Sequence, residues 1–149
     1  KEEAVNTLED LLKSGKALAA FGELIEAQGG DKRVLTDYSL MPQAKHKKDF
    51  VIPGTGKKWL KHIDGRKIAE AAKVMGAGRT KKGDPINLAV GIVLKAKCGD
   101  MLNGGDAICE VHFDTDKDYD AACLKLAQAF TYSDSEVAKP KLIKASIAE

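Results

Sequence analysis

Residues 86–113 read INLAVGIVLKAKCGDMLNGGDAICEVHF, and this stretch decides the fold. Every second residue from Ile86 to Ala96 is apolar, which is the pattern of a β-strand with one buried face. Gly-Asp pairs at residues 99–100 and 105–106 then predict turns on both sides of a short extended segment. Alternation resumes on an inner face formed by Ala107, Cys109, Val111 and Phe113, with Ile108, Glu110 and His112 opposite. The stretch therefore predicts strand, turn, short strand, turn and strand, with no room for a helix.

The size and composition describe one globular domain, or one domain with an attached piece. The 149 residues are 44% hydrophobic and 31% charged, with a formal net charge of +2. Such a balance does not call for a nucleic acid or a membrane surface as partner, and the lysine clusters have few aromatic residues beside them. No apolar run approaches the roughly 20 residues of a membrane span, and no signal-peptide pattern opens the chain. Because the sequence begins at Lys1 and turns helical at once, we expect a piece of a longer polypeptide.

Two short amphipathic helices are predicted before the first strand, over residues 2–13 and 16–28. Ser14 is placed to cap the second helix, and Gly29 and Gly30 end it. Two helices of this length cannot bury both apolar faces against each other and remain stable in water. We therefore expect them to dock on a larger body.

The rest of the chain predicts an α+β fold. After a loop over residues 31–43, strands are expected at 44–52 and 59–63 around a turn at 53–56. Asp64 should cap a helix that reaches Met75, and its buried face should consist of Ile68, Ala71, Ala72 and Met75. A second helix should span residues 117–130, and its inward face should consist of Cys123, Leu126, Ala127 and Phe130. Residues 131–138 look turn-rich, and 141–147 are expected to form a last edge strand. The order strand, glycine turn, strand occurs at residues 52–63 and again at 94–113, which predicts two interlocking halves of a small β-sandwich with a helix between them.

Sites for chemistry are scarce in the sequence. Three cysteines, Cys98, Cys109 and Cys123, lack disulfide or metal spacing and indicate free thiols in a reducing compartment. The histidines show no zinc pairing, and the Asp114–Asp120 series lacks the glycine of a calcium loop because Tyr119 stands there, so no metal is expected.

One connection is a candidate site. Residues 76–85 form a long, basic, glycine-rich connection with Gly76, Gly78 and Arg79. Such a loop can present backbone N–H groups and a guanidinium to an anion, although a surface arginine closing a helix end explains it equally well.

A series of short motifs, in this order, resembles the C-terminal part of the pyrimidine-nucleoside and thymidine phosphorylases. They are SGKAL (14–18), EAQGGD (26–31), PQAK (42–45), GAGR (76–79), VGIVL (90–94) and the Gly-Asp pairs at 99–100 and 105–106. No single motif is specific, but the ordered set covers nearly the whole chain. One departure is PGTGKKW (53–59), where the family usually has a tighter turn of glycine and an aromatic residue.

The resemblance implies a parent enzyme, a pentosyltransferase, that performs reversible phosphorolysis of pyrimidine nucleosides. Phosphate, a co-substrate, attacks the anomeric carbon and gives the free base and a pentose 1-phosphate; no cofactor is implied. The family's phosphate- and base-binding residues lie upstream of Lys1, so no catalytic residue is expected here and the isolated chain should be inactive. A cytoplasmic homodimer is implied for the parent.

By the same resemblance, residues 1–30 are expected to be helices of an upstream α/β domain. Residues 31–149, with a core at about 44–130, are expected to form a domain similar to the hammerhead (barrel-sandwich hybrid) fold of biotinyl and lipoyl carriers. Gly76, Gly78 and Arg79 then become a candidate loop that orders when the two domains close over substrate.

Two alternatives remain open from the residues. A lipoyl or biotinyl carrier would share the 99–111 segment, but the Met-Lys-Met and Asp-Lys-Ala tripeptides that carry the modified lysine are absent. A scaffold or dimer-forming domain also describes the chain.

Overall fold

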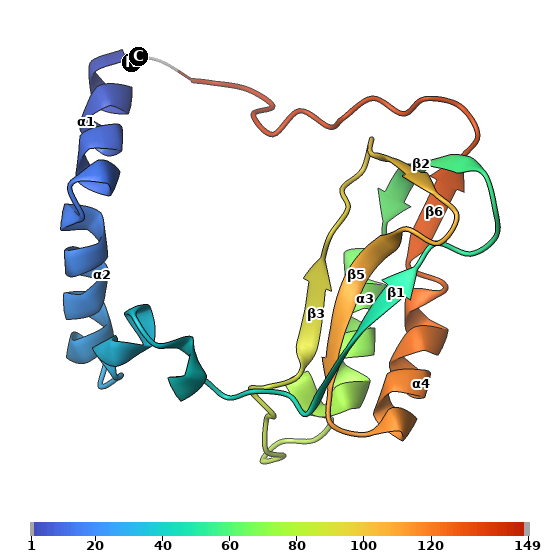
Figure 1. Ribbon diagram of the computed structural model, residues 1–149, viewed down its shortest axis with the longest axis horizontal. Coiled ribbons are helices and arrows are strands. Elements are labelled where there is room, and N and C mark those ends of the chain that lie inside the picture. Colours follow the sequence, from blue (N-terminus) through green and yellow to red (C-terminus); the bar gives the residue numbers. More distant parts are fainter. Residues whose placement is uncertain (1, 148–149) are drawn as a thin grey trace. The chain divides into compact units, whose positions relative to one another are not determined.

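The computed structural model describes residues 2–147, which fall into two compact units, one ending at Pro42 and the other beginning at Gln43 (Figure 1). The fold is mixed α+β, as the sequence predicts: the first unit is helical, and the second combines strands and helices. The assignment of residues 1–30 to an upstream α/β domain concerns a body outside these residues and stays a prediction.

The first unit contains α1 (Glu2–Lys13) and α2 (Lys16–Ala27), followed by two 3₁₀ turns, η1 (Lys32–Leu35) and η2 (Tyr38–Leu40). Both helices lie where their periodicity predicts them. Ser14, however, does not cap α2. Its hydroxyl donates to the Leu11 carbonyl at 3.4 Å, and the N-cap position is taken by Gly15 at a φ of 76°.

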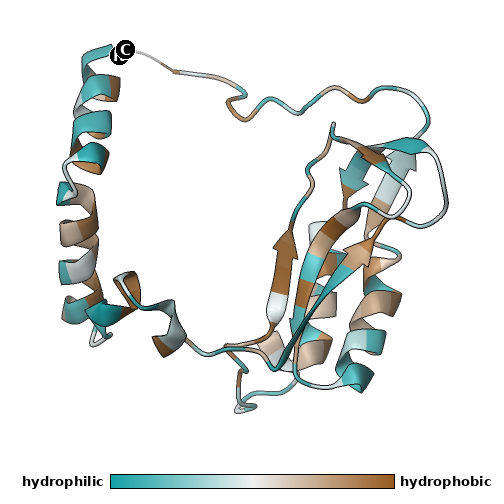
Figure 2. Ribbon diagram, in the orientation of Figure 1, coloured by the Kyte–Doolittle hydropathy of each residue, from teal (hydrophilic) through white to brown (hydrophobic). Residues whose placement is uncertain are grey.

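The apolar faces of α1 and α2 are largely exposed. No residue of α1 is buried, and Gly22 alone is buried in α2. Figure 2 shows hydrophobic residues along both helices, and the exposed ones are Val5, Leu8, Leu11, Leu12, Leu18, Phe21 and Leu24. The first unit therefore has no apolar core of its own within the described residues.

The second unit is built on two antiparallel three-stranded sheets. One has the order β1 (His46–Val51), β5 (Ala107–Phe113), β3 (Gly91–Leu94). The other has the order β4 (Met101–Asn103), β2 (Lys57–Ile63), β6 (Phe130–Ser133). Helices α3 (Gly65–Ala72) and α4 (Asp116–Leu126) pack against each other and contact the first sheet (Figure 1).

A single hydrophobic core joins both sheets to the helices. Strand β5 contributes most to it, with fully buried Ile108, Cys109, Val111 and Phe113. Leu60 of β2 and Leu126 of α4 are buried in the same cluster. The core therefore holds the two sheets and both helices together as one cooperative unit.

The two halves predicted from the repeated strand–turn–strand order interlock through their glycine turns. Gly104 N–H donates to the Gly56 carbonyl at 2.8 Å, and Gly105 N–H donates to the Ile52 carbonyl at 3.1 Å. A Cβ on Gly104 would lie 2.1 Å from the Gly54 carbonyl oxygen, far inside contact distance. Only glycine therefore allows the two turns to cross this closely.

The predicted strand over residues 86–96 is wrong in its first half. Regular pairing begins at Gly91, and Leu88 is 77% exposed. The cause is Asn87, whose side-chain Oδ1 accepts from the Ala89 N–H at 3.0 Å and closes a local turn. From Val90 onward the inner face is as predicted, with Val90 and Ala96 buried.

Strand β5 departs from strict alternation at Ile108, which is buried although it was predicted on the outer face. β1 pairs Phe50 with Cys109 and Val51 with Ala107, so Ile108 is an extra residue on β5. Its carbonyl accepts from both Lys95 and Ala96 at 2.8 and 3.2 Å. Such a bulge turns the side chain inward, and a pattern of period two cannot anticipate it.

The C-terminal predictions also need correction. α4 ends at Leu126, so Ala127 is exposed rather than inward-facing, and Phe130 begins β6 instead of ending a helix. β6 was not predicted, because Thr131–Ser133 was interpreted as turn. Residues 141–147 form no strand.

Candidate functional site

The candidate loop starts at the end of α3, whose position is set by an N-terminal cap. Asp64 Oδ1 accepts from the Arg66 and Lys67 N–H groups at 3.0 and 3.2 Å, as predicted. On the predicted stripe, Ala71 and Met75 are buried. The helix then passes into a π-helical turn, η3 (Lys73–Ala77).

Gly76 breaks the helical backbone within this turn. Its φ of 101° is accessible to glycine and strained for other residues. Its carbonyl accepts from the Asn87 N–H at 2.9 Å, and a Cβ at position 76 would lie 3.4 Å from Asn87 Cβ. The loop is therefore tied at its start to the turn that precedes β3.

Asp84 organises the body of the loop. Its Oδ2 accepts from the Thr80 and Lys81 N–H groups at 3.1 and 2.7 Å. Arg79 Nε donates to the Asp84 carbonyl at 3.2 Å, and the arginine is exposed. The Thr80 and Lys81 N–H groups are therefore occupied by Asp84, while the exposed guanidinium of Arg79 keeps N–H groups that could contact an anion.

Asn87 and Asp114 fix the far side of the loop to the first sheet. Asn87 Nδ2 donates to Asp114 Oδ2 at 2.8 Å, while Asp114 Oδ1 accepts from the Lys45 N–H at 3.0 Å. These two hydrogen bonds, the one from Lys45 first, lower the pKa of Asp114. Sequence reasoning missed both residues. Asparagine, a residue that favours turns, within an otherwise strand-like stretch was the signal that could have found Asn87.

Gly76, Gly78 and Arg79 thus lie together on a loop with a defined shape. None of the three contacts a catalytic constellation within residues 2–147. No group of three His, Cys, Asp or Glu residues in this part of the chain is arranged to hold a metal ion. Cys109 is buried, and burial raises the pKa of its thiol to about 12, which is unsuited to a nucleophile.

A charged network crosses the exposed face of the first sheet. Lys95 Nζ lies 2.5 Å from Asp49 Oδ1 and 3.3 Å from Glu110 Oε2, and His112 Nε2 lies 2.7 Å from Glu110 Oε1. The hydrogen bonds from His112 and then Lys95 lower the pKa of Glu110. The network links Asp49 of β1 and Glu110 of β5 to Lys95, the residue that follows β3.

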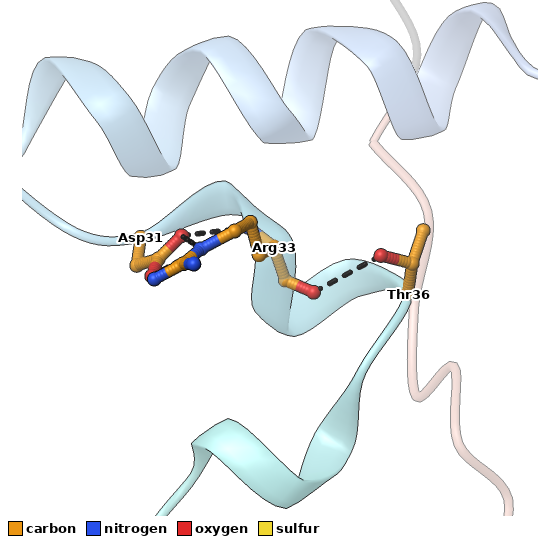
Figure 3. A network of polar contacts seen from close by, with 3 residues as sticks. All are labelled: Asp31, Arg33 and Thr36. Atoms are coloured by element: carbon orange, nitrogen blue, oxygen red, sulfur yellow. Dashed lines mark hydrogen bonds and ion pairs between the residues drawn. The ribbon is translucent and has the colours of Figure 1, made fainter.

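The first unit has an open groove of about 570 Å³ between α2 and η1. Leu18, Ala19 and Leu35 are among its apolar lining residues. Arg33 and Thr36 also line the groove. The Arg33 guanidinium is hydrogen-bonded to the Asp31 carboxylate, with Nε 2.9 Å from Oδ2, and the Thr36 hydroxyl donates to the Arg33 carbonyl at 3.1 Å (Figure 3). The hydrogen bonds from Arg33 lower the pKa of Asp31 to about 2.

The described residues thus define a small α+β domain with a hydrogen-bonded surface loop, attached to a helical unit that lacks a core. Comparison with known proteins gives its family. The pattern of the Pyrimidine nucleoside phosphorylase C-terminal domain matches residues 59–133, half of the chain. The chain belongs to that family, as the resemblance in its sequence indicated.

Two relatives extend the similarity beyond the matched domain. The pyrimidine-nucleoside phosphorylase of Bacillus subtilis (strain 168) is 34% identical over 148 residues, which cover 99% of this chain and 33% of the relative. That of Staphylococcus aureus (strain USA300) is 35% identical over 148 residues, with the same coverage. The chain therefore spans about a third of the length of the curated relatives it matches.

Among residues 2–147, every helix is too short or too polar to span a lipid bilayer.

Proposed function

We propose that this chain acts as the C-terminal third of a pyrimidine-nucleoside phosphorylase, a pentosyltransferase. The parent enzyme would convert a pyrimidine nucleoside and phosphate to the free base and a pentose 1-phosphate. The observation that carries the proposal is the similarity over 148 residues to a relative three times as long. A cytoplasmic location and a homodimeric parent form part of the same proposal.

Within that enzyme, this chain shapes and closes the active-site cleft and supplies no catalytic residue. Residues 1–30 belong to the upstream α/β domain, and residues 31–149 form a hammerhead-like domain. Two observations support this division. The apolar faces of α1 and α2 are not buried within the first unit, and the crossed glycine turns join the two small sheets of the second unit, which has its own core.

The loop over residues 76–85 is proposed to face substrate and to become ordered against it on closure. Its support is the exposed Arg79, whose Nε bond to Asp84 leaves the rest of the guanidinium without a partner among the described residues. An arginine in this position suits an anionic oxygen of phosphate or of the departing base.

A chimera tests the proposal. The upstream two thirds of the Bacillus subtilis relative would be joined to Lys1 of this chain, and thymine release from thymidine would be followed with phosphate present and absent. We expect phosphate-dependent release by the chimera and none by the 149-residue chain alone. Activity of the isolated chain, or a folded but inactive chimera, would contradict the proposal.

The loop is tested in the same chimera. Arg79→Ala should lower kcat by roughly tenfold or more while leaving Tm unchanged, because removing one charged contact to the transition state costs at least about 1.4 kcal/mol. Lys82→Ala, which removes a neighbouring charge from the same loop, serves as the matched control. Unchanged kinetics of the Arg79 variant would remove the loop from the proposal.

The carrier alternative is decided by intact mass. The turn at residues 103–106 reads Asn-Gly-Gly-Asp and presents no lysine for a prosthetic group. A biotinyl or lipoyl adduct on any lysine of the chain, produced in cells that carry the attaching enzymes, would replace the proposed function.

A further inference from the structure

Residues 141–147 have the sequence of a β-strand without the structure of one. They read KLIKASI, in which Ile143, Ala145 and Ile147 alternate with polar residues. In the structure the segment is irregular, and Leu142, Ile143 and Ile147 are 98%, 78% and 97% exposed. A lone strand is unstable because its backbone N–H and C=O groups need an edge to pair with.

Lys139, which lies two residues before this segment, is fixed by contacts with Gly99 and Asp100. Lys139 Nζ lies 3.0 Å from Asp100 Oδ1. The chain passes Gly99 so closely that a Cβ there would lie 2.9 Å from Lys139 Cα. Gly99 and Asp100 are in turn bonded to Leu60 of β2. Residues 141–147 therefore begin close to a fixed point beside the second sheet.

The sheet edges of the second unit are all shorter than a strand of seven residues. With the observed strand orders, the outer strands are β1, β3, β4 and β6. Their lengths are 6, 4, 3 and 4 residues. Pairing with one of these edges, in the same chain or in a second copy, would leave part of the segment's backbone unpaired.

We propose that residues 141–147 form a β-strand by adding to a longer sheet edge in the upstream part of the phosphorylase. The inference rests on the proposed function. It is supported by the alignment over 148 of the 149 residues of this chain with relatives whose other two thirds lie outside it. Ile143, Ala145 and Ile147 then lie on one face of the extended sheet, and the strand fastens the small domain to the large one at a second place, restricting how far the cleft opens.

Hydrogen exchange on the chimera described above tests the pairing directly. In the chimera, amides of residues 141–147 should exchange at least about tenfold more slowly than in the isolated chain, because paired strand amides are protected. The double variant Ile143→Lys/Ile147→Lys should restore fast exchange and lower Tm. Ser146→Lys, on the opposite face of the same segment, is the matched control and should retain the protection.

The outcomes separate this inference from the proposed function. An active chimera whose 141–147 amides exchange as fast as in the isolated chain overturns the strand and leaves the function standing. An inactive chimera with protected amides supports the strand and counts against the function. Protection in the isolated chain that grows with its concentration identifies a second copy as partner and overturns the inference.

A second measurement covers a chimera that does not fold. The separately produced upstream part of the Bacillus subtilis relative would be titrated with this chain, intact or ended after Pro140. We expect the shortened chain to bind at least about tenfold more weakly, as loss of a paired strand implies. Equal binding of the two chains would overturn the inference.

Discussion

The two units, one ending at Pro42 and the other beginning at Gln43, differ in whether their apolar side chains are buried. In the first unit, leucines recur along α1 and α2 and remain exposed, and only Gly22 of the two helices is buried. In the second, apolar side chains from both sheets and both helices meet in one cluster. Burial of apolar surface is the main favourable term in folding. The second unit therefore has a core that can support its folding, whereas the first has no such core among its own described residues.

The largest effect is expected where the two glycine turns cross. Gly104→Ala would place a methyl group 2.1 Å from the Gly54 carbonyl oxygen, so the turns must separate and lose the bonds between them. We expect a loss of at least about 3 kcal/mol from the free energy of unfolding. Fluorescence of Trp59, the one tryptophan, reports urea unfolding of the second unit.

Gly65→Ala is the control for that substitution. Gly65 is the first residue of α3, and a Cβ there meets nothing within 4 Å. Alanine at such a position should be neutral or slightly stabilising. A Gly104 variant as stable as this control would show that the crossing is not needed for the fold.

Leucine substitutions compare the two units side by side. Leu126→Ala removes a fully buried side chain from α4 and should cost roughly 2–5 kcal/mol. Leu12 of α1 and Leu124 of α4 are both 72% exposed, and Leu→Ala at either should change stability by less than about 0.5 kcal/mol. Urea unfolding monitored by Trp59 and by far-UV circular dichroism measures all three. A large loss for Leu12 would mean that α1 packs on the second unit.

Helix caps give a smaller difference between the same units. Asp64 accepts two backbone N–H groups at the start of α3, so Asp64→Ala should destabilise the second unit by about 1 kcal/mol. Ser14 makes no such bond at the start of α2, so Ser14→Ala should leave helicity unchanged. Thermal unfolding followed at 222 nm distinguishes the two variants, and equal effects would contradict the assigned caps.

The sequence predicted what local chemistry determines. Helix α1, the Asp64 cap and the glycine turns follow from spacing and residue type, and the structure confirms them. It failed where one side chain acts both locally and at a distance: Asn87 closes a turn through the Ala89 N–H, and it also bonds Asp114, 27 positions away. Ile108 turns inward at a bulge set by two neighbouring strands. Of the candidate site, the glycines and Arg79 were found, while Asp84 and Asn87, which shape the loop, were not.

The smallest effect concerns the charged pair in the first unit, where order is local. Arg33 lowers the pKa of Asp31 from 3.8 to about 2. The stabilisation of the η1 turn by the ionised Asp31 carboxylate is therefore fully present above pH 4. As the pH falls toward 2, protonation of the folded-state carboxylate removes it. An NMR titration of the Asp31 carboxyl carbon should give a midpoint near 2. Arg33→Ala should raise the midpoint toward the value of a free aspartate, with part of the lowering kept because the backbone N–H of residue 33 still donates to Asp31, and it should not change the Trp59 unfolding curve. An Asp31 midpoint that does not change in Arg33→Ala would mean that the N-cap hydrogen bond alone lowers the pKa of the carboxylate. A shifted Trp59 unfolding curve would mean that the stabilities of the two units are coupled.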